Sequence, residues 1–201
     1  MSVGVLEYGL GNFGSVMNML KRLDADPCIV RTPEDVAQSE RLLLPGVGAF
    51  DRGMLLLETA GLDVAIREFA AGGRPVLGIC LGMQLLLDSS EEGASAGLGL
   101  VPGRCMRFSE GRGLRVPHMG WNRVTAKSQD PLFATVPEDN RFYFVHSYHA
   151  VPADPSHTLA TTNYGDDFVS MVRRDNVIGA QFHPEKSHLF GLEMLRSFST
   201  L

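Results

Sequence analysis

The chain has 201 residues, 44% of them hydrophobic and 20% charged, which is enough apolar material for one sizeable core. Its 23 acidic and 18 basic residues give a formal net charge of -5, which offers no general attraction for nucleic acid or an anionic membrane. The three cysteines, Cys28, Cys80 and Cys105, fit neither a disulfide framework nor a thiolate metal site, so a reducing, cytoplasmic location is expected.

In the first half of the chain, apolar β-rich runs alternate with segments of helical periodicity. This alternation is typical of βαβ units, in which helices cover both faces of a parallel sheet. The longest apolar run, residues 76–87, is shorter than the roughly 20 residues of a bilayer span, so no membrane segment is predicted. Strands are expected at residues 3–8, 27–31, 41–44 and 75–79, and helices near 12–23, 54–71 and 81–87.

The second half consists of short strand-like pieces separated by Gly, Pro and Asp turns. We expect antiparallel and mixed extensions of the same sheet. No linker or repeat separates the halves, so the sequence predicts one α/β domain over residues 1–201, with a mostly parallel sheet, helices on both faces and an antiparallel extension. The strand-like pieces are 103–108, 114–116, 121–125, 141–147, 157–162, 168–173 and 177–182, followed by a helix at 188–198.

Cys80 lies between two glycines in Gly78-Ile79-Cys80-Leu81-Gly82, after an apolar strand and before a helical run. A nucleophile elbow requires this context, because the glycines let the strand turn sharply while the central side chain projects over the sheet edge. The positive end of the helix would favour the thiolate there. A buried structural cysteine is the ordinary alternative, but the flanking glycines favour a nucleophile.

A thiolate nucleophile needs a proton shuttle, and His183 in Gln181-Phe182-His183-Pro184-Glu185 is the best candidate. Residues two apart in an extended segment project to the same side, so Glu185 can accept one imidazole N–H and leave the other nitrogen for Cys80. The alternative is that His183 and Pro184 form an ordinary surface turn and that Glu185 is solvated. We predict a Cys-His-Glu triad.

Acyl transfer also needs donors for the developing oxyanion. The backbone N–H of Leu81, the residue after the nucleophile, supplies one. The segment Pro45-Gly46-Val47-Gly48 follows a buried strand and so reaches the same edge of the sheet, where Val47 or Gly48 can offer a second N–H.

These motifs resemble those of the class I, triad-type glutamine amidotransferases, whose elbow continues as in Met83-Gln84 and whose base motif reads His-Pro-Glu. Within that family the chain is similar to the glutaminase subunits of imidazole glycerol phosphate synthases of histidine biosynthesis. The resemblance covers nearly the whole chain and implies that family's flavodoxin-like fold. The segments that carry it are 8–12, 45–50, 117–122, 144–148 and 182–187.

The resemblance implies hydrolysis of glutamine: Cys80 attacks the side-chain amide, ammonia leaves with a proton from His183, and water releases glutamate. No cofactor or metal is expected, and His146 and His149 are interpreted as structural because no carboxylate or cysteine stands at ligand spacing near them. The positions matching the glutamine site are Gly46, Gly48, Gln84, Ser147 and Tyr148.

The same resemblance implies a partner. Ammonia would cross to a cyclase subunit with a (βα)8 barrel, which forms imidazole glycerol phosphate and AICAR, and the two chains would make a heterodimer. The positions matching the subunit contact and ammonia gate are Leu10, Asn12, Trp121, Tyr143 and Lys186.

Four other functions remain open. A glutaminase could instead serve anthranilate, GMP or carbamoyl phosphate synthesis, and a cysteine peptidase or an inactive regulatory subunit could share the elbow. The pattern Gly9-x-Gly11-x-x-Gly14 also permits a nucleotide-dependent oxidoreductase, but the second strand ends at Arg31 instead of the acidic residue that binds a ribose hydroxyl, and the triad is then unexplained.

Overall fold

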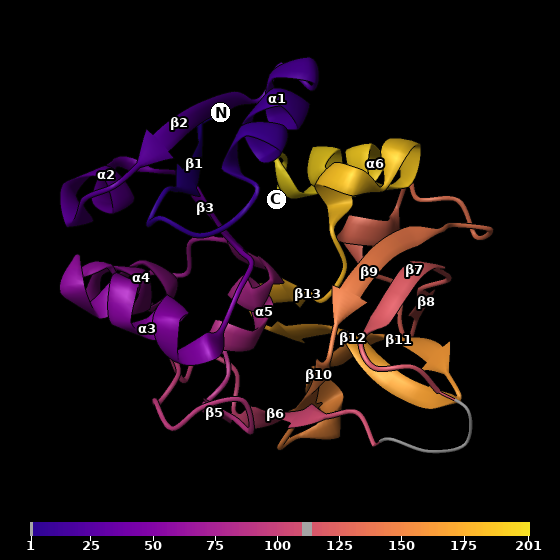
Figure 1. The fold of residues 1–201 in the computed structure, drawn as a ribbon. Coiled ribbons are helices and arrows are strands. Elements are labelled where there is room, and N and C mark those ends of the chain that lie inside the picture. The colour runs from indigo at the N-terminus through magenta and orange to yellow at the C-terminus, as the bar shows by residue number, and fades with distance from the viewer. Residues whose placement is uncertain (1, 110–113) are drawn as a thin grey trace.

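One eleven-stranded sheet runs through the computed structural model, which describes residues 2–109 and 114–201 (Figure 1). Its parallel part has the order β2-β1-β3-β4-β13, and the α/β arrangement expected from the sequence is confirmed. The last of these strands comes from the far end of the chain, so the sheet joins both halves of the sequence. The strands are β1 (Ser2–Leu6), β2 (Asp26–Val30), β3 (Arg41–Gly46), β4 (Val76–Cys80) and β13 (Val177–Ala180).

Helices cover both faces of the parallel strands because successive residues of each strand point to opposite sides. Leu43 packs into the core beneath α1 (Phe13–Arg22) and α6 (His188–Phe198), whereas Leu42 and Leu44 pack into the core beneath the remaining helices. Figure 1 shows α1 and α6 on one side of the sheet and α3 and α4 on the other. The helices of the second layer are α2 (Pro33–Gln38), α3 (Phe50–Thr59), α4 (Leu62–Ala71) and α5 (Leu81–Leu85).

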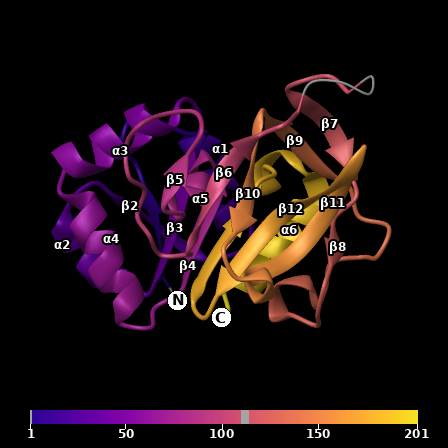
Figure 2. The same ribbon diagram turned by 90° about the horizontal axis from the view of Figure 1, so that it is seen from below.

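The antiparallel extension continues from β13 through β12, β10 and β6, with β5 at the far edge, β11 beside β12 and β8 beside β11. Figure 2 shows β10, β11 and β12, in orange and yellow, beside the indigo and magenta first half of the chain. The 3-10 turns η1 (Pro131–Phe133), η2 (Pro155–His157) and η3 (Pro184–Lys186) lie between strands or before α6. The strands are β5 (Ser89–Ser90), β6 (Gly103–Arg107), β8 (Thr125–Ala126), β10 (Tyr148–Pro152), β11 (Thr158–Tyr164) and β12 (Asp166–Arg174).

Two strands of the second half do not join the main sheet, contrary to the sequence expectation. Among the strands that the structure describes, β7 (His118–Asn122) and β9 (Phe142–His146) pair only with each other, as an antiparallel ribbon. The strand expected at 114–116 is not formed, and the chain enters β7 through a cis peptide bond before Pro117. Within the described residues, a β-bridge between Tyr143 and His183 and a hydrogen bond from Nδ2 of Asn122 to the Asn163 carbonyl connect the ribbon to the rest of the fold.

The helices differ from the sequence expectation in two places. The single helix expected at 54–71 is two helices, which are separated at Gly61, where φ is 66°. The short helix α2 was not expected, although Thr32 and Asp35 form a capping box around Pro33, which is a recognisable helix start. None of the described helices combines the length and apolar character needed to cross a bilayer.

Candidate active site

Three neighbouring parallel strands bring the predicted motifs to one edge of the sheet. β3 and β4 pair with Gly46 opposite Cys80, and β4 and β13 pair with Ile79 opposite Ala180. Carboxyl ends of parallel strands meet at the same edge, so Val47 and His183 follow β3 and β13 on either side of Cys80.

Cys80 is the turning point between β4 and α5 and has φ 55° and ψ -110°, a conformation that non-glycine residues rarely adopt. The flanking glycines are required by close packing. A β carbon on Gly78 would lie 2.6 Å from the carbonyl oxygen of Gly82, and one on Gly82 would overlap the carbonyl oxygen of Leu44. The sharp turn expected of a nucleophile elbow is therefore present, and it holds the sulfur over the sheet edge.

His183 and Glu185 form a buried pair in which Nδ1 lies 2.8 Å from Oε1 of the carboxylate, with the two side chains 1% and 2% exposed. Nε2 is also buried and bonds to no nitrogen or oxygen of the described residues, which leaves Cys80 as its neighbour. Burial lowers the pKa of His183, but interactions with Cys80 and Glu185 outweigh it and raise that pKa to about 9. The imidazole is therefore protonated at neutral pH beside the sulfur.

A pocket of about 340 Å³ opens over Cys80 and His183. Val47 and Leu81 line it, as do four of the five positions matched to glutamine binding, Gly48, Gln84, Ser147 and Tyr148. Gly46 does not line it. Gly46 instead packs against the elbow, where a β carbon would lie 2.8 Å from both the Gly82 nitrogen and the Tyr8 hydroxyl.

The pocket contains free backbone donors. The N–H groups of Val47 and Gly48 form no hydrogen bond with any residue that the structure describes, and Leu81 is the first residue of α5, so its N–H has no acceptor within the helix. Gly48 has φ 115°, which turns the loop over the pocket. These three N–H groups are available to stabilise the negative charge that develops on a carbonyl oxygen when the Cys80 sulfur attacks its carbon.

Two polar residues of the site were missed at the sequence level. Glu92 reaches the pocket rim, where its Oε2 accepts a hydrogen bond of 2.9 Å from the backbone N–H of Phe50. Gln181 is fully buried behind Cys80 and lies 3.9 Å from Sγ through its Nε2. The sequence held a signal for Gln181, because it stands in the same Gln-Phe-His-Pro-Glu motif as the base and directly follows β13.

Two histidines beside the pocket bond to each other. Nδ1 of His118 lies 3.0 Å from Nε2 of His146, and Nδ1 of His146 lies 2.8 Å from the carbonyl oxygen of Tyr148. Burial lowers the pKa of His118 to about 4 and that of His146 to about 3, so both are neutral. His146 is thus a satisfied structural histidine, as predicted. No group of three or more potential metal ligands is present among residues 2–109 and 114–201.

Three of the predicted partner-contact residues cluster beside the base. Trp121 is 56% exposed and meets the ring of Tyr143 edge-on at 4.9 Å, with the Lys186 ammonium 5.5 Å from the centre of that ring. Leu10 lies beside the Val47–Gly48 loop, since a β carbon on Gly48 would lie 3.8 Å from its Cδ2, and Asn12 is half-buried at the start of α1. Trp121, Tyr143 and Lys186 therefore gather on the side of the catalytic base, and Trp121 is a surface residue, not part of the core.

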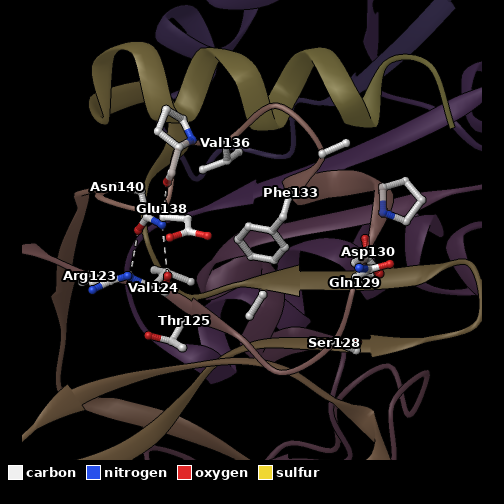
Figure 3. Close-up of a pocket in the computed structure, with 14 residues that line it drawn as sticks. Arg123, Val124, Thr125, Ser128, Gln129, Asp130, Phe133, Val136, Glu138 and Asn140 are labelled. Carbon is white, nitrogen blue, oxygen red and sulfur yellow. Dashed lines mark hydrogen bonds between the residues drawn. The ribbon is translucent and has the colours of Figure 1, made fainter.

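A larger cavity, of about 720 Å³, is formed entirely by the segment from Arg123 to Asn140 and is shown in Figure 3. Phe133 forms part of its lining, and Asn140 bonds both the N–H and the carbonyl of Val124. It shares no lining residue with the catalytic pocket and contains none of the predicted site residues. The smaller pocket is therefore the candidate active site.

The fold is that of known amidotransferases. PurLQS from Thermotoga maritima superposes with a TM-score of 0.76 at 20% identity, covering 98% of this chain and 96% of that chain. A structure described as glutamine amidotransferase gives a TM-score of 0.72 at 22% identity and covers 99% of both chains.

The sequence matches are closer. The chain is 48% identical over 198 residues to imidazole glycerol phosphate synthase subunit HisH 2 of Pseudomonas aeruginosa, and 43% identical over 197 residues to the protein of that name from Methanococcus maripaludis. Each alignment covers 98% of both proteins. Residues 5–200 match the family model described as glutamine amidotransferase class-I. The chain therefore belongs to the class I glutamine amidotransferase family.

Proposed function

We propose that this chain is the glutaminase subunit of an imidazole glycerol phosphate synthase, which hydrolyses glutamine and passes the ammonia to a cyclase subunit. The observation that carries the proposal is the convergence of Cys80, His183 and Glu185 at one sheet edge, in a chain that aligns over 98% of its length with proteins named HisH. Residues 1–201 would act as one amidotransferase domain, because both halves of the chain contribute to the triad.

In the first step, the Cys80 thiolate attacks the carboxamide carbon of glutamine, and the carbonyl electron pair moves onto oxygen. The N–H groups of Leu81 and of Val47 or Gly48 stabilise that oxyanion. The His183 imidazolium protonates the departing nitrogen, the C–N bond breaks, and ammonia leaves while a thioester forms on Cys80.

In the second step, neutral His183 takes a proton from water, whose oxygen attacks the thioester carbon. Collapse of this adduct expels the Cys80 thiolate and releases glutamate, so the imidazolium-thiolate pair is restored. Glu185 stabilises the charged imidazole before and after each turnover, because its carboxylate stays 2.8 Å from Nδ1 in a buried site.

Glutamine also has to be held by its polar ends. Gln84 uses its Nε2 on protein acceptors, which leaves its Oε1 to accept a hydrogen bond from the substrate carboxamide. Glu92 is the acidic side chain on the rim, at a place suited to the substrate's α-ammonium group. Gly48, Ser147 and Tyr148 complete the walls.

The cyclase, which we propose is a (βα)8 barrel, would dock over the pocket mouth. Trp121, Met119 and Leu189 are large exposed apolar side chains on the ribbon and the start of α6, and interfaces concentrate such aromatic and methionine side chains. The backbone N–H of His183 bonds to the Tyr143 carbonyl, so this surface is directly connected to the catalytic base. A cytoplasmic location is proposed because the chemistry needs Cys80 as a reduced thiol.

The test is to mix the chain with a candidate cyclase and measure glutamate formation with and without the cyclase's nucleotide substrate. Stimulation by the nucleotide is expected. Cys80→Ala should abolish synthesis from glutamine while the complex still uses added ammonium salt. Normal use of glutamine by that variant would disprove the proposal, and stimulation by an anthranilate, GMP or carbamoyl phosphate synthase partner in place of the cyclase would reassign the pathway.

The docking surface has its own test. Trp121→Ala should weaken cyclase binding by about 30-fold, because a central aromatic anchor commonly contributes about 2 kcal/mol or more to association. The matched control is Leu55→Ala on α3, an equally exposed side chain on the other layer of the fold. Titration by calorimetry with equal weakening by both substitutions would rule out this surface as the contact.

A further inference from the structure

Two side chains donate to the carbonyl oxygen of Tyr148, and that oxygen fixes the orientation of both. Nδ1 of His146 lies 2.8 Å from it and Nε2 of Gln84 lies 3.3 Å from it. A carbonyl oxygen only accepts hydrogen bonds, so the Gln84 atom facing it must be the amide nitrogen and the His146 nitrogen must carry a proton.

The orientation of Gln84 in turn fixes that of Gln181. Nε2 of Gln84 also lies 3.1 Å from the side-chain oxygen of Gln181, and this contact is favourable only if Gln181 presents oxygen to it. The amide nitrogen of Gln181 must then point the opposite way, where it lies 3.9 Å from Sγ of Cys80. An N–H donor is therefore aimed at the sulfur by a chain of contacts that begins at a backbone carbonyl.

The sheet register explains why this donor reaches Cys80. Ala180 of β13 stands opposite Ile79 of β4, so Gln181 is the next residue beside Cys80. Gln181 is fully buried and does not line the catalytic pocket, so its N–H is directed to the sulfur and not to a ligand in that pocket. A buried donor makes a stronger hydrogen bond to an anionic sulfur than to a neutral thiol.

We propose that Gln181 is a further catalytic residue, whose side-chain N–H hydrogen-bonds the Cys80 thiolate and keeps the sulfur ionised and aimed at the substrate. This role rests on the proposed function, in which Cys80 is the nucleophile. It complements His183, which loses its charge when it protonates the leaving nitrogen, because the uncharged amide stays a donor throughout the cycle.

The measurement is the rate of Cys80 alkylation by iodoacetamide between about pH 5 and about pH 10, followed by mass spectrometry of the full chain. Cys28→Ser serves as the background because Cys28 is exposed, and Cys80→Ala gives the blank. Gln181→Met keeps the side-chain volume and removes the donor, while Gln181→Glu keeps an acceptor for Gln84 and replaces the donor with a carboxylate.

The alkylation midpoint is expected to rise by about one pH unit in Gln181→Met, and by more in Gln181→Glu, where a negative group faces the sulfur. The titratable groups around Cys80 are Tyr8 after β1, the pocket-lining Glu92, His146 and Tyr148, and the pair of His183 and Glu185 after β13, and they are the same in every variant. A structural role alone would lower the melting temperature and leave the midpoint unchanged, and that result would overturn the proposal.

Gln84→Met provides an independent check if a Gln181 variant fails to fold. It leaves Gln181 in place but removes its orienting partner, so a smaller rise in the midpoint is expected, and an unchanged midpoint in this variant would also count against the role. Alkylation needs neither glutamine nor cyclase. A shifted midpoint in a chain that hydrolyses no glutamine would therefore reject the glutaminase function alone, and normal hydrolysis with an unshifted midpoint would reject the role of Gln181 alone.

Discussion

The two walls of the catalytic pocket are built in different ways. The wall after β13 is closed to solvent: His183 is 1% exposed, and the buried Glu185 carboxylate behind it bonds directly to the imidazole. The wall after β3 is open: Val47 is 39% exposed, and the N–H groups of Val47 and Gly48 have no acceptor within the described residues. The first wall is preorganised by charge and burial, whereas the second is held by backbone conformation and is free to respond to what binds there.

The largest expected effect comes from removing charge from the closed wall. Glu185→Gln can still accept the Nδ1–H of His183 but no longer balances an imidazolium in a buried site, where Oε2 of Glu185 has no other partner among the described residues. The value of kcat for glutamine hydrolysis in the cyclase complex should fall by about 10³-fold, with little change in KM.

Glu185→Asp is the matched control for this substitution, because it keeps the charge and shortens the reach. It should retain more activity than Glu185→Gln at every pH. If steady-state kinetics gave Glu185→Gln a kcat within threefold of the unaltered chain, the buried carboxylate would not be part of the reaction, and the closed wall would serve folding only.

A smaller effect is expected from the open wall, where backbone conformation matters instead of charge. A β carbon at position 48 meets only Leu10 Cδ2, at 3.8 Å, so there is space for it, but φ is 115°. Gly48→Ala therefore favours a different loop conformation by about 1–2 kcal/mol. The N–H groups turn from the oxyanion, and kcat should fall about tenfold.

Val47→Ala tests whether the loop acts through its backbone. The Val47 side chain is largely exposed and the substitution leaves the N–H in place, so kcat should stay within about twofold of the unaltered value. If Val47→Ala lowered kcat as much as Gly48→Ala, the Val47 side chain itself would contact substrate or partner. The loop would then not act through its backbone alone.

The sequence predicted the parts of this site that depend on local patterns. The elbow around Cys80 follows from glycine spacing and a strand-helix boundary. The pairing of His183 with Glu185 was also predicted, but from the two-residue period of an extended segment, whereas Glu185 lies in the 3-10 turn η3 and contacts the imidazole from there. The helix at 188–198 was placed with its observed bounds because its apolar periodicity is uninterrupted.

What the sequence did not reveal depends on contacts between distant segments. The ribbon of β7 and β9 reads as two ordinary strands, and nothing within either segment says that they leave the main sheet. The bond between His118 and His146 joins residues 28 positions apart, and that between Gln84 and Gln181 joins residues 97 apart. Gly46 was matched to substrate binding by motif, but it packs against the elbow because the strand register brings it opposite Cys80.

The two sides of the pocket should differ least in how their stability depends on pH. The buried side includes the His118–His146 pair, which can be protonated in acid, whereas the Val47–Gly48 loop has no titratable side chain. The pKa values of these histidines are lowered to about 4 and about 3, against about 6.5 in an unfolded chain. Below pH 6.5 these histidines bind protons in the unfolded chain but not in the folded protein, so folding stability is lost as pH falls toward 4. His183 acts in the opposite sense, since its raised pKa favours the fold below pH 6.5 and that contribution is lost as pH rises through about 9.

His118→Phe should flatten the acid side of this profile, because phenylalanine keeps the stacking on Phe144 and cannot be protonated. Between pH 7 and pH 5.5 the unfolding free energy of the unaltered chain should fall by about 1 kcal/mol more than that of the variant, as urea titrations at each pH would measure. Exposed His188→Gln, which takes away an unburied imidazole, should leave the slope unchanged. If the unfolding free energy changed equally with pH in all three proteins, protonation of the buried His118–His146 pair would not destabilise the fold. Burial would then have no effect on protonation beyond the catalytic triad.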